Sequence, residues 1–348
     1  MTLLRLIGIL AGGLFLIWSV AALRRDTARA GLTPLTIPTG FALVLVGAFP
    51  GLAGVGATLL ELGRYPGSRL IVLLILVAAV FWMTLLVVLS RLRKLGLQLD
   101  ATIRTYLLAK LDATGVPVPE RCVLCVIPAL DEAINLSAVI RAQPETINGR
   151  PVRCLVIDDG STDATAGVAE QAGALVVRNP VTRGGGAALR VGFEAALRWN
   201  ACCAVTLDAD GQNDPGEIHR LVEPIVRGEA DIVVGSRILG VHHRANWWRH
   251  AGVILFSKIF NVLMETKITD IASGYRAVRP DALRRLPLRQ DQYHTAEFLV
   301  FSAKRGAQIV EVPITFYRRA SGRSKKGPEV LYGLRFAYVL FRSWVRAI

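Results

Sequence analysis

One stretch decides the fold of this chain: Val205-Thr206-Leu207-Asp208-Ala209-Asp210-Gly211-Gln212-Asn213-Asp214-Pro215. Its apolar start suits a buried strand, and it runs directly into carboxylates and turn-forming residues. Asp208 and Asp210 stand two residues apart, so at the end of a strand both side chains point to the same face. Two facing carboxylates repel one another unless a cation lies between them, and carboxylate oxygens suit Mg²⁺ or Mn²⁺. The alternative is a pair of solvated turn carboxylates, and the surrounding sequence favours the cation site.

The composition narrows the class of partner. Of the 348 residues 52% are apolar, and this apolar excess lies in the first hundred residues. The formal net charge of +14 suits nucleic acid, anionic lipid or phosphorylated substrates. Because the arginines lie beside apolar segments and no basic run with interleaved aromatic residues occurs in the globular part, we expect lipid and phosphorylated substrates and no nucleic acid. Five cysteines, an odd number, predict reduced thiols in a cytosolic domain.

The N-terminal part is predicted to be an all-α membrane domain. Three apolar runs, over residues 3–23, 37–62 and 70–89, are each close to the roughly 20 residues that cross a bilayer. They predict three transmembrane helices within residues 1–95, with a cleaved signal peptide as the alternative for the first run. Basic residues cluster after the first and third runs: Arg24, Arg25, Arg29, Arg91, Arg93 and Lys94. Because such clusters stay in the cytoplasm, we expect a multi-pass protein of the cell (inner) membrane whose next domain faces the cytoplasm.

Further segments are amphipathic. In the region 96–119, apolar residues recur at helical spacing up to residue 111, before a stiff hinge at 115–119. This helix lies on the membrane, pairs with another copy to give a homo-oligomer, or is a plain linker. The C-terminal region 327–348 mixes apolar residues with arginines, which predicts an interfacial helix on anionic membrane lipid or a helix packed on the domain's own core. Residues 242–264 have a similar interfacial composition.

The globular domain is predicted over residues 120–326. Five apolar runs suit buried strands: residues 123–127, 153–157, 174–177, 204–207 and 231–237. Their alternation with helical stretches predicts an α/β fold with a mostly parallel sheet and helices on both faces. Polar residues collect after these strands, at the edge where open α/β sheets bind ligands. Gly184-Gly185-Gly186 opens a helix there, either to cradle a phosphate on backbone amides or as a loose turn.

Seven motifs in order carry a resemblance to a known family: Ile127-Pro128-Ala129-Leu130-Asp131-Glu132, Val156-Ile157-Asp158-Asp159-Gly160-Ser161-Thr162-Asp163, Gly184-x-Gly186-Ala187-Ala188, Asp208-Ala209-Asp210-Gly211-Gln212-x-Asp214-Pro215, Gly235-Ser236-Arg237, Asp270-x-x-Ser273-Gly274-Tyr275-Arg276, and Glu311-Val312-Pro313-Ile314 with Arg318-Arg319-x-x-Gly322-x-Ser324-Lys325. Over residues 120–326 the chain resembles family 2 glycosyltransferases, above all dolichol-phosphate mannosyltransferases and bacterial polyprenyl-phosphate glycosyltransferases. The N-terminal part resembles, more loosely, a small membrane domain that elsewhere is a separate partner of such enzymes. Leu130 and Asp131 depart from the aromatic residue and Asn usual at these positions, which bears on the choice of nucleotide base.

The resemblance implies a nucleotide-sugar-binding glycosyltransferase A-type fold and assigns roles by position. It gives nucleotide contacts to Pro128, Leu130, Glu132, Asp158, Asp159 and Asp208. It makes Asp208, Asp210 and Gln212 metal ligands, and Asp210, Gln212 and Arg237 catalytic residues. It gives phosphate or acceptor contacts to Arg183, Arg237, Ser273, Arg276, Arg319, Ser324 and Lys325. Two alternatives stay open: a strand-end turn for Asp158-Asp159, and a helix-surface charge for Glu297.

The implied reaction moves a hexose from a UDP- or GDP-sugar to a polyprenyl phosphate, undecaprenyl or dolichyl, with inversion at the anomeric carbon. A lipid phosphate oxygen attacks, a nucleoside diphosphate leaves, and Mg²⁺ or Mn²⁺ stabilises the leaving charge. A phosphate monoester has a second pKa of roughly 6 and is largely dianionic at neutral pH, so no strong base is needed. The sequence leaves open the sugar and the nucleotide. It also leaves open a non-lipid acceptor and a catalytically silent membrane scaffold of the same fold.

Overall fold

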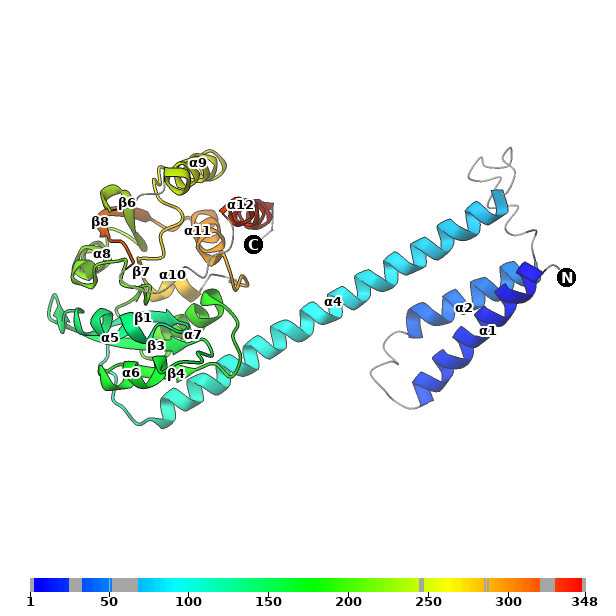
Figure 1. The fold of residues 1–348 in the computed structure, drawn as a ribbon, viewed down its shortest axis with the longest axis horizontal. Coiled ribbons are helices and arrows are strands. Elements are labelled where there is room, and N and C mark those ends of the chain that lie inside the picture. Colours follow the sequence, from blue (N-terminus) through cyan, green and yellow to red (C-terminus); the bar gives the residue numbers. More distant parts are fainter. Residues whose placement is uncertain are drawn as a thin grey trace. The chain divides into compact units, whose positions relative to one another are not determined.

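The structure is a computed structural model that describes residues 3–24, 33–49, 51, 68–243, 247–284, 286, 288–319 and 329–345. The chain divides into two compact units, Met1–Leu99 and Asp100–Ile348. One long helix, α4 (Ser68–Ala113), begins in the first unit and contributes residues 100–113 to the second (Figure 1).

The first unit also contains α1 (Leu3–Arg24) and α2 (Thr33–Ala48), which pack against each other. Their backbones approach closely where Gly12 faces Gly40, since a Cβ atom on Gly12 would lie 2.6 Å from the Gly40 carbonyl oxygen. Within the described ranges, no helix has both the length and the hydropathy required to cross a membrane. The three predicted spans are therefore not confirmed and stay a prediction.

The second unit is built on one eight-stranded sheet with the strand order β2-β3-β1-β5-β7-β6-β8, and β4 is also paired to β3. The strands are β1 (Val123–Ala129), β2 (Thr146–Ile147), β3 (Arg150–Asp158), β4 (Leu175–Arg178), β5 (Cys203–Thr206), β6 (Ile232–His242), β7 (Arg276–Val278) and β8 (Ile309–Phe316). The helices are α5 (Ala133–Arg141), α6 (Thr165–Gln171), α7 (Gly185–Arg198), α8 (Ile218–Val226), α9 (Trp247–Met264), α10 (Pro280–Arg284), α11 (His294–Lys304) and α12 (Glu329–Val345) (Figure 1).

The predicted α/β class is confirmed, and the predicted sheet is correct only in part. β1 pairs in parallel with β3 and β5, β3 with β4, and β6 with β8. β7, however, runs antiparallel between β5 and β6, which makes the sheet mixed. β7 was not predicted because it is only three residues long and begins with a charged residue, Arg276. This short strand joins the two halves of the sheet.

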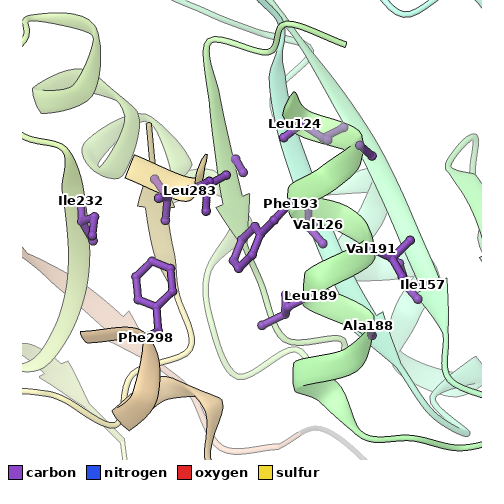
Figure 2. Packing of buried hydrophobic residues seen from close by; sticks show 14 of the residues in the cluster. Leu124, Val126, Ile157, Ala188, Leu189, Val191, Phe193, Ile232, Leu283 and Phe298 are labelled. Atoms are coloured by element: carbon purple, nitrogen blue, oxygen red, sulfur yellow. The ribbon is translucent and has the colours of Figure 1, made fainter. Parts of the chain in front are cut away.

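Helices cover both faces of the sheet, as predicted. Successive residues of β1 belong to opposite cores, because side chains alternate along a strand. Leu124 and Val126 contribute to the core that contains α7, α11 and α12, whereas Val123, Cys125 and Ile127 contribute to the core that contains α5 and α8. Figure 2 shows Val126 beside α7. β1 is thus buried on both faces, which explains its continuous apolar sequence.

The end of α4 belongs to the core of the second unit. Its apolar residues Ile103, Leu107, Leu108 and Leu111 are buried in the same cluster as the side chains of α7. The predictions that this part of the helix lies on a membrane or pairs with another copy are therefore wrong for these four residues. The helical spacing of these apolar residues was predicted correctly. The surface on which they pack belongs to the chain's own domain, and periodicity in the sequence does not identify that surface.

The C-terminal helix α12 packs on its own domain, as one of the two alternatives predicts, and the lipid-facing alternative stays a prediction. Phe336, Val339 and Leu340 are buried in the core of the second unit, whereas Tyr338 and Phe341 are 61% and 60% exposed. One side of α12 therefore packs on its own domain, and the other side presents apolar groups to the surroundings.

The contact between α7 and β1 yields a stability prediction. A Cβ atom on Gly192 would lie 2.1 Å from a methyl carbon of Val126, so Gly192→Ala forces the helix away from the strand. We expect Gly192→Ala to lower the free energy of unfolding by about 1–3 kcal/mol. Gly167→Ala is the control, because Gly167 lies in helix α6 with open space around it and gains up to about 1 kcal/mol from helix propensity. Thermal unfolding of the full chain, followed by circular dichroism, measures both, and equal melting temperatures for the two variants would contradict the close approach.

Candidate active site

Three parallel strands end at the same edge of the sheet and carry the candidate site. β1 lies between β3 and β5 and is parallel to both. Glu132 follows β1, Asp158-Asp159 stands at the end of β3, and Asp208 and Asp210 follow β5. The topology thus brings together carboxylates that belong to separate motifs of the sequence.

The loop after β1 holds a backbone conformation that few residues adopt. Asp131 has a φ of +44°, in the left-handed region where Asn and Asp are the best tolerated residues after glycine. Its carboxylate accepts a hydrogen bond from the Thr162 backbone amide at 2.7 Å. Asp131 thus fills the backbone role that an Asn can fill, which accounts for this departure from the family pattern. Pro128 and Leu130, both partly buried, precede it, and Glu132 behind it is 8% exposed.

The first carboxylate at the end of β3, that of Asp158, is 1% exposed. Its Oδ1 accepts a hydrogen bond from the Ser161 backbone amide at 2.8 Å, and its Oδ2 lies 3.3 Å from Arg178 Nε. This residue closes the turn that follows β3, in agreement with the turn alternative. A contact between Asp158 and a nucleoside stays a prediction.

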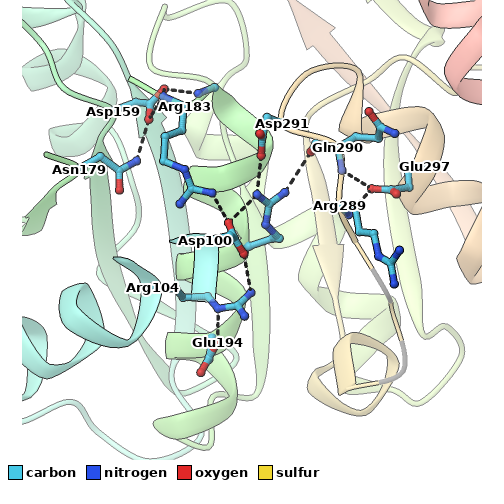
Figure 3. Close-up of polar contacts among 12 residues, drawn as sticks. Asp100, Arg104, Asp159, Asn179, Arg183, Glu194, Arg289, Gln290, Asp291 and Glu297 are labelled. Atoms are coloured by element: carbon cyan, nitrogen blue, oxygen red, sulfur yellow. Dashed lines mark hydrogen bonds and ion pairs between the residues drawn. The ribbon is translucent and has the colours of Figure 1, made fainter. Parts of the chain in front are cut away.

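The second carboxylate, that of Asp159, holds a distant loop. Asp159 accepts hydrogen bonds from Asn179 Nδ2 at 2.7 Å and from the backbone amides of Arg183 at 3.0 Å and Gly184 at 2.6 Å (Figure 3). Its 3% exposure agrees with this internal role. A nucleotide contact by Asp159 likewise stays a prediction, and any such contact depends on the loop that these amides belong to.

The loop after β5 presents Asp208, Asp210 and Gln212. A Cβ atom on Gly274 would lie 3.3 Å from Asp208 Oδ1, so the Asp208 carboxylate packs closely against the backbone of this glycine. Asp210 Oδ1 accepts a hydrogen bond from the Gln212 backbone amide at 3.1 Å. The backbone amide of Tyr317 donates to the Gln212 carbonyl at 2.7 Å, and Gln212 Nε2 donates to the Tyr317 carbonyl at 3.2 Å. The segment after β8 is therefore fixed to the carboxylate loop.

This fixed segment brings a cation into the site. Arg319 Nη2 lies 3.0 Å from Glu132 Oε1 and 3.0 Å from Asp210 Oδ2. The two carboxylate side chains are 9% and 13% exposed, and that of Arg319 is 20% exposed. One guanidinium nitrogen therefore bridges the loop after β1 and the loop after β5.

The donor set fits a divalent cation that shares its coordination with a substrate. Among the residues with described positions, no group of three or more His, Cys, Asp and Glu side chains could hold a metal ion. Mg²⁺ commonly takes one or two protein carboxylates and completes its octahedron with water and substrate phosphates. Asp208 and Asp210 can supply those carboxylates, and the pairing of Asp210 with Arg319 shows that this position stabilises positive charge.

Arg237, predicted as catalytic and phosphate-binding, is paired with a buried acid. Its Nε and Nη2 lie 2.6 and 2.7 Å from the two carboxylate oxygens of Asp270, and its guanidinium also lies 5.0 Å from the centre of the Phe316 ring. Asp270 has no exposed surface. Burial would raise the pKa of Asp270, but the charge and hydrogen bonds of Arg237 lower it below its ordinary value. The pair fixes the Arg237 side chain, and a phosphate contact by Arg237 stays a prediction.

Two other predicted phosphate-binding residues are buried. Ser273 is 3% exposed, and its Oγ accepts a hydrogen bond from the Tyr275 backbone amide at 3.3 Å. Arg276 is also 3% exposed, and it donates to the carbonyls of Ile271 at 2.9 Å and Thr295 at 3.3 Å. Burial lowers the pKa of Arg276 to about 9. The predicted residues Ser324 and Lys325 lie outside the described residues.

The glycine-rich turn differs from the predicted phosphate cradle. The Gly184 amide donates to Asp159, and the Gly186 amide donates to the Asp291 carbonyl at 2.8 Å. A Cβ atom on Gly186 would lie 2.1 Å from the Gln290 carbonyl oxygen. A phosphate cradle on these two amides is therefore wrong, and Gly186 is required because another backbone segment packs against it. The guanidinium of Arg183, a residue predicted to bind phosphate, donates a hydrogen bond to the Asp100 carboxylate (Figure 3).

Glu297 and Asp100 make polar contacts that the sequence did not predict. Glu297 is 1% exposed and accepts hydrogen bonds from the backbone amides of Arg289 at 2.7 Å and Gln290 at 2.8 Å, so the surface-charge alternative is wrong. In the sequence, the sign of a role for Glu297 was its resemblance to a recurring acidic position of the family. Asp100 stands 83 residues before its partner Arg183, in a helix whose charge pattern resembles a solvated face. Only the folded chain reveals this contact.

Comparison with known proteins adds to this geometry. Residues 125–286 match the protein family described as Glycosyl transferase family 2. Polyprenol monophosphomannose synthase of Mycolicibacterium smegmatis is 33% identical over 226 residues, which span 60% of this chain and 82% of that protein. Undecaprenyl-phosphate mannosyltransferase of Micrococcus luteus is 32% identical over 214 residues, which span 58% of this chain and 86% of that protein.

A solved structure agrees at the level of the fold. Glucosyl-3-phosphoglycerate synthase from Mycobacterium tuberculosis, in complex with Mn²⁺, uridine diphosphate and glucosyl-3-phosphoglycerate, aligns with a TM-score of 0.53. The alignment covers 66% of this chain and 81% of the other, at 22% sequence identity. At this identity the similarity shows a shared mixed α/β fold.

The bridging guanidinium yields a prediction about metal binding. Because Arg319 neutralises Asp210 and Glu132, a divalent cation must compete with it for these carboxylates. We expect Arg319→Gln to bind Mn²⁺ roughly 2- to 5-fold more tightly than the unmodified chain, the equivalent of one partly exposed ion pair. Paramagnetic resonance of free Mn²⁺ measures the affinity without nucleotide. Arg318→Gln is the matched control, because the neighbouring Arg318 donates to the His243 carbonyl instead, and equal affinities for the two variants would refute the competition.

The buried pair yields a pH-dependent prediction. Asp270→Asn leaves the Arg237 guanidinium without its countercharge, and we expect a loss of about 3 kcal/mol in the free energy of unfolding at pH 7. The lowered pKa of Asp270 means that its stabilisation is present above the ordinary value of 3.8 and is lost as the pH falls through the lower folded value. The difference between the two proteins in urea titrations should therefore shrink as the pH falls below 3.8 towards the lower folded pKa. Asp281→Asn, at a 78% exposed side chain, should change stability by under about 0.5 kcal/mol, and a pH-independent effect of Asp270→Asn would contradict the ion pair.

Proposed function

Because the chain belongs to glycosyl transferase family 2, we propose that it transfers a hexose from a nucleotide-sugar to a polyprenyl phosphate, with inversion at the anomeric carbon. One observation carries the proposal: the carboxylates of three family motifs meet at one edge of the sheet, with Arg319 between two of them. The names of the two relatives, a polyprenol monophosphomannose synthase and an undecaprenyl-phosphate mannosyltransferase, support a lipid phosphate as the acceptor and mannose as the first sugar to test.

On the donor side, the loops after β1 and β3 receive the nucleoside, through Pro128, Leu130, Glu132 and the Asp158-Asp159 pair. The loop after β5 receives the diphosphate, with Asp208 and Asp210 as carboxylate ligands of Mg²⁺ or Mn²⁺ and Gln212 beside them. When bound there, the divalent cation offsets the charge that develops on the departing nucleoside diphosphate. Arg319 joins Glu132 to Asp210, which supports the assignment of the nucleoside and the diphosphate to neighbouring loops.

On the acceptor side, the lipid phosphate supplies its own nucleophile. Its dianion carries no proton that must be removed, so the chain's contribution is to bind and orient it. Arg319 is well placed to exchange a carboxylate partner for a phosphate oxygen, since a guanidinium binds phosphate oxygens as well as carboxylate oxygens. Arg237 of β6, oriented by Asp270, is the second cation we assign to the acceptor.

Two helices of the second unit support a lipid acceptor. α9 packs on α12, with the rings of Phe256 and Phe336 5.2 Å apart between centroids. Both helices also expose large apolar side chains: Leu255, Ile259, Val262, Leu334, Tyr338, Phe341 and Val345. Arg335 and Arg342 of α12 are exposed beside them, a combination suited to the surface of an anionic bilayer. We further propose that the three N-terminal apolar runs anchor the chain in the cell (inner) membrane, with the second unit in the cytoplasm.

The experiment uses the purified full chain with Mn²⁺ and undecaprenyl phosphate. GDP-mannose, UDP-glucose and UDP-N-acetylglucosamine are offered separately, and mass spectrometry detects a lipid-linked sugar. We expect a product with one donor, its loss with EDTA, and a rate lowered roughly a hundredfold or more in Asp210→Asn, since metal-ligand losses cost several kcal/mol of transition-state stabilisation.

The matched control is Asp214→Asn in the same loop. Asp214 caps the turn Pro215–Glu217 by accepting a hydrogen bond from the Gly216 amide at 2.9 Å, and Asn preserves such a cap. This variant should retain the rate of the unmodified chain. Nucleotide release without a lipid-linked product would move the acceptor away from lipid, and a fully active Asp210→Asn would remove the metal from the proposal.

A further inference from the structure

The helix that joins the two units reaches the candidate site through one side chain. Asp100 of α4 is the first residue of the second unit, and its side chain is 14% exposed. Arg183 donates a hydrogen bond to its carboxylate, Arg190 Nη2 lies 2.8 Å from it, and Arg104 Nη1 lies 3.6 Å from it (Figure 3). Burial would raise the pKa of Asp100, but the hydrogen bonds and charges of Arg190 and Arg183 lower it, so the group is anionic at neutral pH.

Arg183 is held at both of its ends. Its guanidinium pairs with Asp100, and its backbone amide donates to Asp159 together with the amide of Gly184. Asp159 belongs to the carboxylate group at the edge of the sheet, at the end of β3. A connected chain of contacts therefore runs from α4 through Arg183 to a residue assigned to the nucleotide.

The other side of the glycine-rich turn is fixed by the same network. Arg190, which also pairs with Asp100, lies 2.5 Å from Asp291 Oδ1 and donates to the Gln290 carbonyl at 3.2 Å. The Asp291 carbonyl in turn accepts a hydrogen bond from the Gly186 amide. Asp100 is therefore the shared acceptor of two arginines that hold the turn from opposite sides.

The charges of this network balance. Three arginines, Arg104, Arg183 and Arg190, face three acids, of which Asp100 is shared and the others are Glu194 and Asp291. The side chains of Arg183 and Arg190 are only 12% and 7% exposed. Loss of the Asp100 charge therefore leaves two poorly solvated guanidinium groups close together, and their repulsion acts directly on the glycine-rich turn.

We propose that Asp100 is a positioning residue for the donor nucleotide, acting through Arg183 on the clasp between Asp159 and the backbone amides of residues 183 and 184. This inference rests on the proposed function. It places a determinant of the site outside residues 125–286, the segment that matches the family. The catalytic unit is accordingly incomplete without the last turns of α4, which also supply the buried residues Leu107 and Leu108 to its core.

The test compares two aspartates of the same helix in the full chain. Asp100→Asn should raise the KM for the nucleotide-sugar roughly tenfold with little change in kcat, since contacts in one network are energetically coupled and the loss affects binding of the donor. Asp112→Asn is the control, because Asp112 also joins α4 to α7 but through an exposed pair with Arg198 at 2.9 Å. It should leave KM unchanged.

A double-mutant cycle separates positioning from general destabilisation. If Asp100 acts through Arg183, then Asp100→Asn and Arg183→Gln should each raise KM, and the double variant should resemble either single variant. Fully additive effects, or an equal rise in KM for Asp112→Asn, would overturn the proposal.

Hydrogen exchange gives a readout that is independent of activity. The amides of residues 183 and 184 should exchange at least several-fold faster in Asp100→Asn than in the unmodified chain or in Asp112→Asn. If the unmodified chain transfers no sugar, the proposed function fails, and the exchange measurement still decides whether Asp100 holds the clasp. Unchanged exchange at these amides would overturn the role of Asp100 whatever the activity.

Discussion

Crowding of negative charge at one edge of the sheet is the constraint on which the second unit depends. Parallel pairing of β1 with β3 and β5 forces the carboxylates of three motifs together, where burial strengthens their repulsion. Four of these carboxylates have a compensating partner: Asp158 has Arg178, Asp159 has backbone amides, and Asp210 and Glu132 share Arg319. A sheet edge that carries this much negative charge is suited to a ligand that binds together with a divalent cation.

One of these partners, Arg319, comes from a distant part of the chain and reaches the site through the mixed sheet. The antiparallel strand β7 lies between β5 and β6 and lets β8 join the sheet beyond them, so that the segment after β8 crosses the carboxylate loop and delivers Arg319. On the opposite side, α4 delivers Asp100 to the glycine-rich turn. Arg319 thus joins the loops after β1 and β5, and Asp100 holds Arg183 and Arg190 on the two flanks of the glycine-rich turn.

The sequence predicted the parts of this arrangement that are local. The burial of β1, the position of the carboxylates after β5 and the order of the motifs all follow from short stretches of sequence. The failures concern partners that are far apart in sequence: the apolar face of residues 103–111 packs on its own domain, Arg183 pairs with Asp100, and Gly186 is needed for a neighbouring backbone. Periodicity identifies an apolar face and a motif identifies a position, but neither specifies the surface or the charge that the fold brings opposite.

The most decisive measurement is anomalous X-ray diffraction from crystals of the full chain grown with Mn²⁺ and a nucleoside diphosphate. We predict one manganese peak within coordination distance of Asp208 or Asp210, shared with the diphosphate, and the nucleoside beside Glu132 and the Asp158-Asp159 turn. Arg319 should then have released at least one of its two carboxylates. Manganese or nucleotide bound away from the ends of β1, β3 and β5, with the bridge of Arg319 intact, would contradict the assignment of this edge as the active site.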